Sequence, residues 1–324
     1  MRKRWLSSCL ALALFSTAVP NASAVNVLAD DAPKPWGATP SEAQMYYYHQ
    51  GLSGFVHYGT NTYRNADGIE WGNDGQTTAE HMQVPDTLDT DQWVKVFQDA
   101  GFGRIIYTAK HHDGFRNWHT DEYSTKQSEA QVDILEKLSK SCSDADMDMG
   151  LYLSPWDVYE DKAKKMQTGQ EGTYGNGSGT PDAYPLDDDY NKLFERHLKE
   201  IFENDKYGSD GDFVELWLDG AKNADKEQTY DYHEWIKIAK ELNGKGEKEL
   251  INFQGGDKQE ISWPGNERGE IDKDMWSKLR DEIPNDGTAK SVEFNDPEGE
   301  LWTVWEGDFS IRPGCSITRQ RTIR

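Results

Sequence analysis

The chain has 324 residues, of which 58 are acidic and 35 basic, giving a formal net charge of −23 at pH 7. An acidic surface repels phosphate groups, which argues against nucleic acid and anionic membranes as partners. The length allows one large domain or two ordinary ones. Only Cys142 and Cys315 follow the first 24 residues, too few for a disulfide framework.

The first 24 residues predict a secretory signal peptide. Basic residues 2–4 precede an apolar run over residues 5–19, and Ala-Ser-Ala at 22–24 fits a signal peptidase site. The apolar run is short for a membrane span, and no later stretch is long and apolar enough for one. We therefore expect a secreted protein, cleaved near Ala24 and not attached to a membrane afterwards, with an exposed lead-in over residues 25–40.

Strand-like and helix-like segments alternate from residue 54 onward. Strands are expected at residues 54–59, 104–109, 149–153, 213–218 and 249–253, with a sixth ending near 262 and a seventh over 302–306. Helices are expected around residues 91–100, 132–138, 193–202 and 235–242, the first capped by Thr90 or Asp91. This alternation predicts an α/β fold of the TIM (β/α)8 barrel type. The alternative is a doubly wound sheet, although no Gly-x-Gly-x-x-Gly motif follows any strand.

The apolar strand over 213–218 runs directly into Asp219. In parallel α/β folds, the carboxyl ends of strands form the face that binds ligands. Trp217 lies two positions earlier and so on the same side of the strand, where an aromatic ring would pack against a sugar whose anomeric carbon the carboxylate reaches. The alternative is that Asp219 only caps the following loop.

Hydrolysis of a glycosidic bond needs a second carboxyl group. The candidates near other strand ends are Glu70, Asp157, Glu267 and Glu306. Glu267 stands in a Gly-bounded loop between Asn266 and Arg268, which could orient it or shift its pKa. These residues alone do not choose between Glu267 and Glu306.

Three histidines, His57, His111 and His112, also fall at predicted strand ends. With Asp113 or Asp219 they could be zinc or iron ligands. Adjacent histidines in an extended segment point to opposite sides, however, so His111 and His112 would make poor joint ligands. Neutral imidazoles that hydrogen-bond to sugar hydroxyls fit better in a chain with 12 Trp, 15 Tyr and 11 Phe. On the helix over 193–202, His197 falls on the apolar stripe and is expected to pack.

Five motifs occur in order along the chain. They are Phe-Val-His-Tyr-Gly at 55–59, Glu-Trp at 70–71, Lys-His-His-Asp-Gly-Phe at 110–115, Gly-Leu-Tyr-Leu-Ser-Pro-Trp-Asp at 150–157 and Trp-Leu-Asp-Gly at 217–220. Together they resemble the α-L-fucosidases of glycoside hydrolase family 29, over about residues 35–314. Ser-Pro-Trp-Asp at 154–157 and Trp-Pro-Gly-Asn-Glu-Arg-Gly at 263–269 resemble the branch selective for α-1,3/1,4-linked fucose, as in Lewis-type glycans.

The resemblance implies a secreted, retaining, exo-acting enzyme with Asp219 as nucleophile and Glu267 as general acid/base. The fucose contacts that it implies are His57, Glu70, Trp71, His111, His112, Tyr152, Trp156 and Trp217. A fucosylated oligosaccharide or glycoprotein is the expected substrate, and neither a metal nor an organic cofactor is implied. A fucose-binding, lectin-like protein without turnover is the alternative; it would not need both Asp219 and Glu267.

The resemblance assigns residues 41–314 to the catalytic barrel and stops there. Family members continue after Ser-Ile-Arg-Pro-Gly with Trp-Phe-Tyr-His, then finish the barrel and add a β-sandwich. Here Cys-Ser-Ile-Thr follows at 315–318, which is what a one-nucleotide deletion in codons for Trp-Phe-Tyr-His would encode. We interpret residues 315–324 as a frameshifted tail and expect an incomplete, less stable barrel that lacks its last strand. Resequencing the gene tests this hypothesis: an unbroken frame, with Trp-Phe-Tyr-His in no other frame, contradicts it.

Overall fold

The computed structural model describes residues 35–63, 82–120, 131–155, 157, 188–219, 230–244, 248–253, 259–281 and 294–310. By its internal contacts the chain divides into two units, Met1–Trp36 and Gly37–Arg324, and every element named below belongs to the second. The predicted signal peptide, Glu70, Trp71, Trp156 and the proposed frameshifted tail lie outside the described residues.

The described residues form a sheet of seven parallel strands. These are β1 (Ser53–Val56), β2 (Arg104–Lys110), β3 (Asp148–Leu153), β4 (Glu215–Trp217), β5 (Ile251–Phe253), β6 (Ile261–Ser262) and β9 (Val304–Trp305). They pair in chain order, β1-β2-β3-β4-β5-β6-β9, without a reversal. A doubly wound sheet requires a reversal, so that alternative is wrong. Pairing in chain order confirms the expected barrel type. Within the described residues β1 and β9 each pair on one side only, so this part of the sheet is open, in agreement with the expected incomplete barrel.

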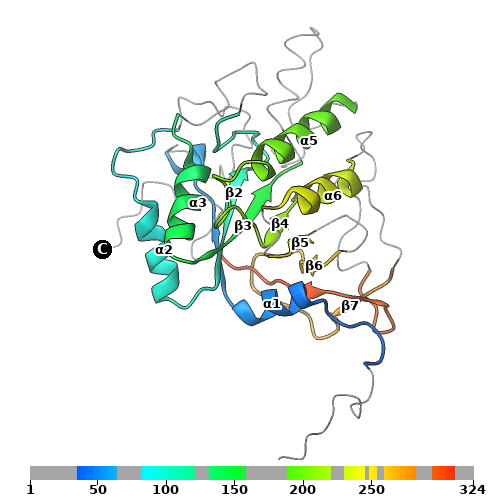
Figure 1. Ribbon diagram of the computed structural model, residues 1–324. Coiled ribbons are helices and arrows are strands. Elements are labelled where there is room, and N and C mark those ends of the chain that lie inside the picture. The colour runs from blue at the N-terminus through cyan, green and yellow to red at the C-terminus, as the bar shows by residue number, and fades with distance from the viewer. Residues whose placement is uncertain are drawn as a thin grey trace, which may run out of the picture. The chain divides into compact units, whose positions relative to one another are not determined.

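Four helices, α2 (Thr90–Asp99), α3 (Ile134–Asp144), α5 (Asp188–Phe202) and α6 (Tyr232–Leu242), surround one face of this sheet (Figure 1). An aspartate begins three of them. Asp89, Asp133 and Asp231 each accept a hydrogen bond from the backbone N–H three residues later. The carboxylate satisfies an N–H that the helix leaves unpaired and lies at the positive end of its dipole. The predicted cap of α2 at Thr90 or Asp91 is therefore wrong by one or two residues.

The strands alternate their side chains between two apolar clusters. Ile105, Tyr107 and Ala109 of β2 face the helices in the outer cluster. The inner cluster is formed by Ile106, Tyr152, Trp217, Ile251, Phe253, Ile261 and Val304, with Ala43 and Tyr47 of the helix α1 (Glu42–Gln50). This period of two is what a barrel wall requires, because alternate residues face the interior and the helix layer.

The helix that covers the inner cluster, α1 (Glu42–Gln50), was not predicted from the sequence. It starts at a capping box, in which the side chains of Ser41 and Gln44 bond to each other's backbone N–H. The Gln44 amide also donates to the carbonyls of Glu260 (2.9 Å) and Trp302 (3.0 Å). Figure 1 shows α1 apart from the four outer helices, close to the last strands of the sheet.

The predicted strand over 302–306 is divided between two sheets. β8 (Leu301–Trp302) pairs antiparallel with β7 (Lys278–Leu279), whereas β9 joins the main sheet. Thr303, between them, is fully buried and its hydroxyl lies 2.7 Å from that of Ser262. A short 3-10 turn, η2 (Thr60–Thr62), follows β1. In the part of the chain described, no helix is both long and apolar enough to cross a membrane.

Candidate active site

The carboxyl ends of β2, β3 and β4 meet at the carboxylate of Asp219. Its Oδ2 accepts a hydrogen bond from the Tyr152 hydroxyl (2.7 Å) and lies 3.6 Å from His112 Nε2. The same hydroxyl is 3.5 Å from His111 Nε2, and the rings of His111 and His57 are 5.4 Å apart. The Asp219 side chain is 30% exposed, so its carboxylate is accessible from solvent although the strand ends around it are buried. The structure therefore brings together five of the predicted site residues, with Trp217 beside them.

Trp217 forms the floor of this site and is held mainly by packing. It is the last residue of β4, and its ring stacks on Phe253 with 4.0 Å between centroids. Tyr152 lies parallel at 6.3 Å and Trp263 edge-on at 6.2 Å. Only 4% of Trp217 is exposed, so most of the indole is used within the inner cluster and little of it is open to a ligand.

The prediction that the two adjacent histidines, His111 and His112, point to opposite sides is wrong. β2 ends at Lys110, and the chain then turns, with Gly114 N–H donating to the carbonyl of His111 (3.0 Å). The turn places the rings of His111 and His112 in contact, 4.4 Å between centroids. The strand alternation on which the expectation rested stops one residue before the pair. Ser154, after β3, hydrogen-bonds to His112 Nδ1 and fixes its ring.

All three imidazoles are neutral at moderate pH. Burial lowers the pKa of His57 to about 4, against the opposing effect of the Asp219 carboxylate. Burial likewise lowers the pKa of His112 to about 4, again opposed by Asp219, and lowers the pKa of His111 well below its usual value. A neutral imidazole has one donor and one acceptor nitrogen, which suits bonds to hydroxyl groups. Among the described side chains, no three His, Cys, Asp or Glu residues form a group that could hold a metal ion.

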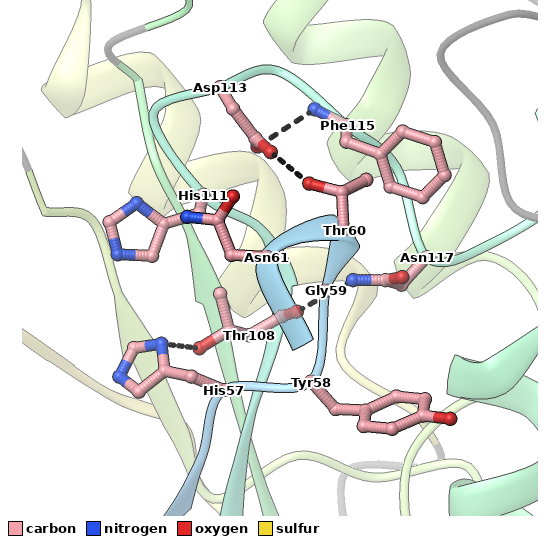
Figure 2. A pocket seen from close by; sticks show the side chains of 10 residues that line it. All are labelled: His57, Tyr58, Gly59, Thr60, Asn61, Thr108, His111, Asp113, Phe115 and Asn117. Carbon is pink, nitrogen blue, oxygen red and sulfur yellow. Dashed lines mark hydrogen bonds between the residues drawn. The ribbon is translucent and has the colours of Figure 1, made fainter. Parts of the chain in front are cut away.

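A small cavity lies behind His57, between the end of β1 and the segment after β2 (Figure 2). Its lining residues are His57, Tyr58, Gly59, Thr60, Asn61, Thr108, His111, Asp113, Phe115 and Asn117. Thr108 holds His57 Nδ1 at 2.8 Å, and Asp113 accepts from Thr60 (3.2 Å) and from Phe115 N–H (3.1 Å). Its volume of about 30 Å3 suits a water molecule and not a sugar ring. The side chains that line this cavity hold the His57 ring and the segment after β2 in place.

Of the candidates for a second carboxyl group, Asp157 is structural. It pairs with Lys110 Nζ at 2.8 Å, and neither side chain is exposed. Glu306, which follows β9, is half-buried and is held by two residues of the inner cluster. Its Oε2 accepts from Tyr47 (2.6 Å) and from Trp217 Nε1 (3.3 Å).

The interior below Trp217 contains a second carboxyl beside Glu306. Glu215 of β4 is fully buried and pairs with Arg104 Nε at 3.0 Å. Burial and the adjacent Glu306 raise the pKa of Glu215 well above its usual range, although Arg104 opposes them. Two carboxyl groups in contact disfavour double ionisation, so this pair retains a proton to higher pH than a single carboxyl would. Their position and their protein partners indicate a structural network.

Glu267 lies in an exposed loop after β6. Gly265 (φ 76°) and Gly269 (φ 70°) bound the loop in the left-handed conformation that glycine adopts readily. Arg268 pairs with Glu270, 2.8 Å away. The far end of the loop is tied to Asp308, a residue that the sequence analysis did not select because no local pattern marks it. Trp263 Nε1 donates to Asp308 Oδ1 (2.6 Å), and Gly269 N–H donates to its carbonyl (2.7 Å).

A parallel β/α barrel whose strand ends gather a carboxylate, neutral imidazoles and aromatic rings has the architecture of a barrel glycoside hydrolase. Residues 35–282 match the α-L-fucosidase family, and the chain belongs to that family. It is 31% identical over 291 residues to Arabidopsis thaliana alpha-L-fucosidase 1, covering 87% of this chain and 50% of the plant protein.

Solved structures of α-L-fucosidase family members are also similar to this chain. A Ruminococcus gnavus GH29 fucosidase in complex with fucose is 34% identical, with a TM-score of 0.66, over 88% of this chain and 58% of that one. A glycoside hydrolase 29 family member from an unknown rumen bacterium is 26% identical, with a TM-score of 0.62, over 87% and 47%. This chain thus spans about half the length of these relatives.

Proposed function

We propose that this protein is a secreted, retaining exo-α-L-fucosidase that removes α-1,3/1,4-linked fucose from Lewis-type glycans or glycoproteins. The observation that carries the proposal is Asp219 at the end of β4, with Tyr152 donating to its Oδ2 and neutral His112 beside it. Family membership supports the sugar, and a relative whose structure is described in complex with fucose supports it further.

The proposed reaction has two displacements. Asp219 attacks the anomeric carbon of fucose while Glu267 gives its proton to the departing glycan oxygen, so the glycosidic bond breaks and a fucosyl ester forms on Asp219. Glu267 then takes a proton from water, which attacks the same carbon and frees the carboxylate of Asp219. This mechanism needs the two carboxyl groups ~5 Å apart when substrate is bound. It uses no metal or organic cofactor.

The remaining roles follow the family resemblance. His57, His111 and His112 would bond the sugar hydroxyls, with Tyr152 and Trp217 forming the wall and floor. Glu70, Trp71 and Trp156, which lie outside the described residues, are proposed to complete the fucose site. The linkage preference rests on the motifs at 154–157 and 263–269, and secretion on residues 1–24.

Release of fucose from a Lewis-type trisaccharide by the purified protein tests this proposal. We expect only weak release from this chain, whose barrel we interpret as incomplete, and its loss in Asp219→Ala, because removing a nucleophile typically lowers kcat about 10⁴-fold. Equal release from an α-1,2-linked fucoside would overturn the linkage assignment. Fucose binding without release by wild type would support the lectin-like alternative instead.

A further inference from the structure

The loop that carries Glu267 has little packing of its own. Residues 267–270 are all exposed, and within 264–270 only Pro264 is buried. Gly265 and Gly269, both in the left-handed conformation, let the backbone turn at either end of the loop but have no side chains that could anchor it. Bonds within the loop, from Asn266 Nδ2 to the Glu270 carbonyl (2.9 Å) and from Arg268 N–H to Asn266 Oδ1 (3.1 Å), shape the turn around Glu267. The placement of the loop relative to the barrel depends on polar contacts with its neighbours.

Asp308, three residues after β9, supplies contacts to both ends of that loop. Its carboxylate accepts from the indole N–H of Trp263 at 2.6 Å, and its carbonyl accepts from Gly269 N–H at 2.7 Å. Next to it, Phe309 and Arg268 form an antiparallel bridge. Asp308 thus bonds to Trp263, which precedes the loop, and to Gly269, near the end of the loop.

Trp263, the donor to Asp308, links this residue to the site, because its ring lies edge-on to Trp217 with 6.2 Å between centroids. The pKa of Asp308 is raised by burial, while the bond from Trp263 acts in the opposite direction. The carboxylates of Glu306 and Asp219 raise the pKa of Asp308 further. A residue there can set where Glu267 stands relative to Asp219.

We propose that Asp308 is a positioning residue that, through its hydrogen bond with Trp263, holds the Glu267 loop and so fixes the separation of the two catalytic carboxyl groups. This inference rests on the proposed roles of Asp219 and Glu267. The acceptor oxygen of Asp308, and not its negative charge, holds Trp263 and so the loop. Misplacing a catalytic group by about 1 Å can cost about 10²-fold in rate.

Paired substitutions separate the acceptor from the charge. Asp308→Asn keeps an amide oxygen for Trp263 and should retain kcat within about threefold, since a neutral acceptor preserves most of the bond. Asp308→Ala removes the acceptor and should lower kcat about 10- to 100-fold with little change in KM. Trp263→Phe removes the donor N–H together with part of the ring that lies edge-on to Trp217, and should be at least as impaired as Asp308→Ala. Because one bond is lost in both cases, the double variant should be no worse than the worse single variant.

The choice of substrate tests whether the effect passes through Glu267. A nitrophenyl fucoside departs without a proton, so Asp308→Ala should impair its hydrolysis far less than that of the trisaccharide. Hydrogen exchange of residues 263–270 gives a readout independent of activity: it should speed up in Asp308→Ala and Trp263→Phe but not in Asp308→Asn.

Three results would overturn the inference: an Asn variant as impaired as the Ala variant, equal losses on both substrates, or unchanged exchange of the loop in Asp308→Ala. Because Trp263→Phe leaves the Asp308 carboxyl intact, it provides the comparison if Asp308→Ala misfolds. Asp219→Ala and Glu267→Gln, assayed alongside, report on the proposed function separately. If those two variants keep wild-type activity, the catalytic assignment fails, whereas the exchange data still decide whether Asp308 holds the loop.

Discussion

Glu306 and Glu267 show how two carboxyl groups at neighbouring strand ends acquire different surroundings. Glu306 is half-buried against the inner cluster, where Tyr47 and Trp217 both donate to one of its oxygens. Glu267 is exposed in a loop with a glycine at each end. A general acid must reach a substrate oxygen, which favours the exposed group.

Substitution by glutamine should rank these two residues. Glu267→Gln removes the transferable proton, and we expect kcat on the trisaccharide to fall about 10²- to 10⁴-fold. Glu306→Gln keeps an oxygen that accepts from Tyr47 and Trp217, so we expect it to stay within about tenfold of wild type. Steady-state kinetics of both variants on the same substrate provide the measurement. A larger loss for Glu306→Gln would reverse the assignment.

The sequence was informative about residues that follow strands and uninformative about contacts between distant segments. Asp219, His57 and His111 were predicted because each falls at the end of a predicted strand, and Asp219 directly follows the apolar run over 213–218. Tyr47 was missed because its partner Glu306 is 259 positions away, and no local periodicity encodes such a bond. Asp308 was missed for the same reason, since Trp263 is 45 positions away.

At the scale of elements, the aspartates that begin the outer helices differ in how many hydrogen bonds they accept from outside their own helix. Asp89 accepts only from Gln92 N–H in an exposed position. Asp133 is buried and accepts from Glu136 N–H (2.8 Å), His119 N–H (3.2 Å) and the Tyr207 hydroxyl (2.7 Å). Asp133 therefore ties the start of α3 to two other segments, whereas Asp89 caps α2 alone.

Alanine at these two positions should separate capping from cross-linking. Asp89→Ala should lower the free energy of unfolding by about 1 kcal/mol, the usual cost of a lost cap. Asp133→Ala should cost about 3 kcal/mol, because it also leaves the buried Tyr207 hydroxyl without its acceptor. Urea unfolding of the two variants at neutral pH measures both. Equal losses would mean that the additional bonds of Asp133 contribute nothing.

Element prediction succeeded where one face is apolar and failed where the cause is remote. The strands over 104–109 and 149–153 were confirmed within one residue as β2 and β3, since both are buried along their whole length. α1 carries no apolar stripe, and its place is set by Gln44 and Tyr47, which bond to segments more than 200 positions away. The division between β8 and β9 depends on β7, which no pattern in 302–306 foretells.

Over the whole molecule, folding buries several histidines in the neutral form. The pKa is lowered in His57, His111, His112 and His197, in each case chiefly by burial. In the unfolded chain these groups take up protons near pH 6.5. Below that pH the unfolded state binds more protons than the folded state, so their contribution to stability is present above pH 6.5 and is lost as the pH falls. Glu215, Glu260 and Asp308, whose pKa values are raised, act in the opposite direction.

His197 allows one of these contributions to be isolated outside the site. It is 1% exposed on α5, packs edge-on against Trp118, and its pKa is lowered well below the usual value by burial and by Arg116 and Lys110. Replacing it by leucine removes a group that only the unfolded chain protonates. From pH 7 to pH 5, His197→Leu should therefore lose less stability than wild type, with a difference in slope of at most about 1.4 kcal/mol per pH unit.

Urea unfolding at half-unit pH steps provides the measurement, and the next residue of α5 provides the control. Leu198 is fully buried and cannot titrate, so Leu198→Ala should lower stability by the same amount at every pH. The expected pattern is a curve parallel to wild type for Leu198→Ala and one that converges on or crosses wild type toward acid for His197→Leu. A parallel curve for His197→Leu would mean that His197 is protonated alike in the folded and unfolded chain, and the acid sensitivity would then have to arise at the histidines around Asp219.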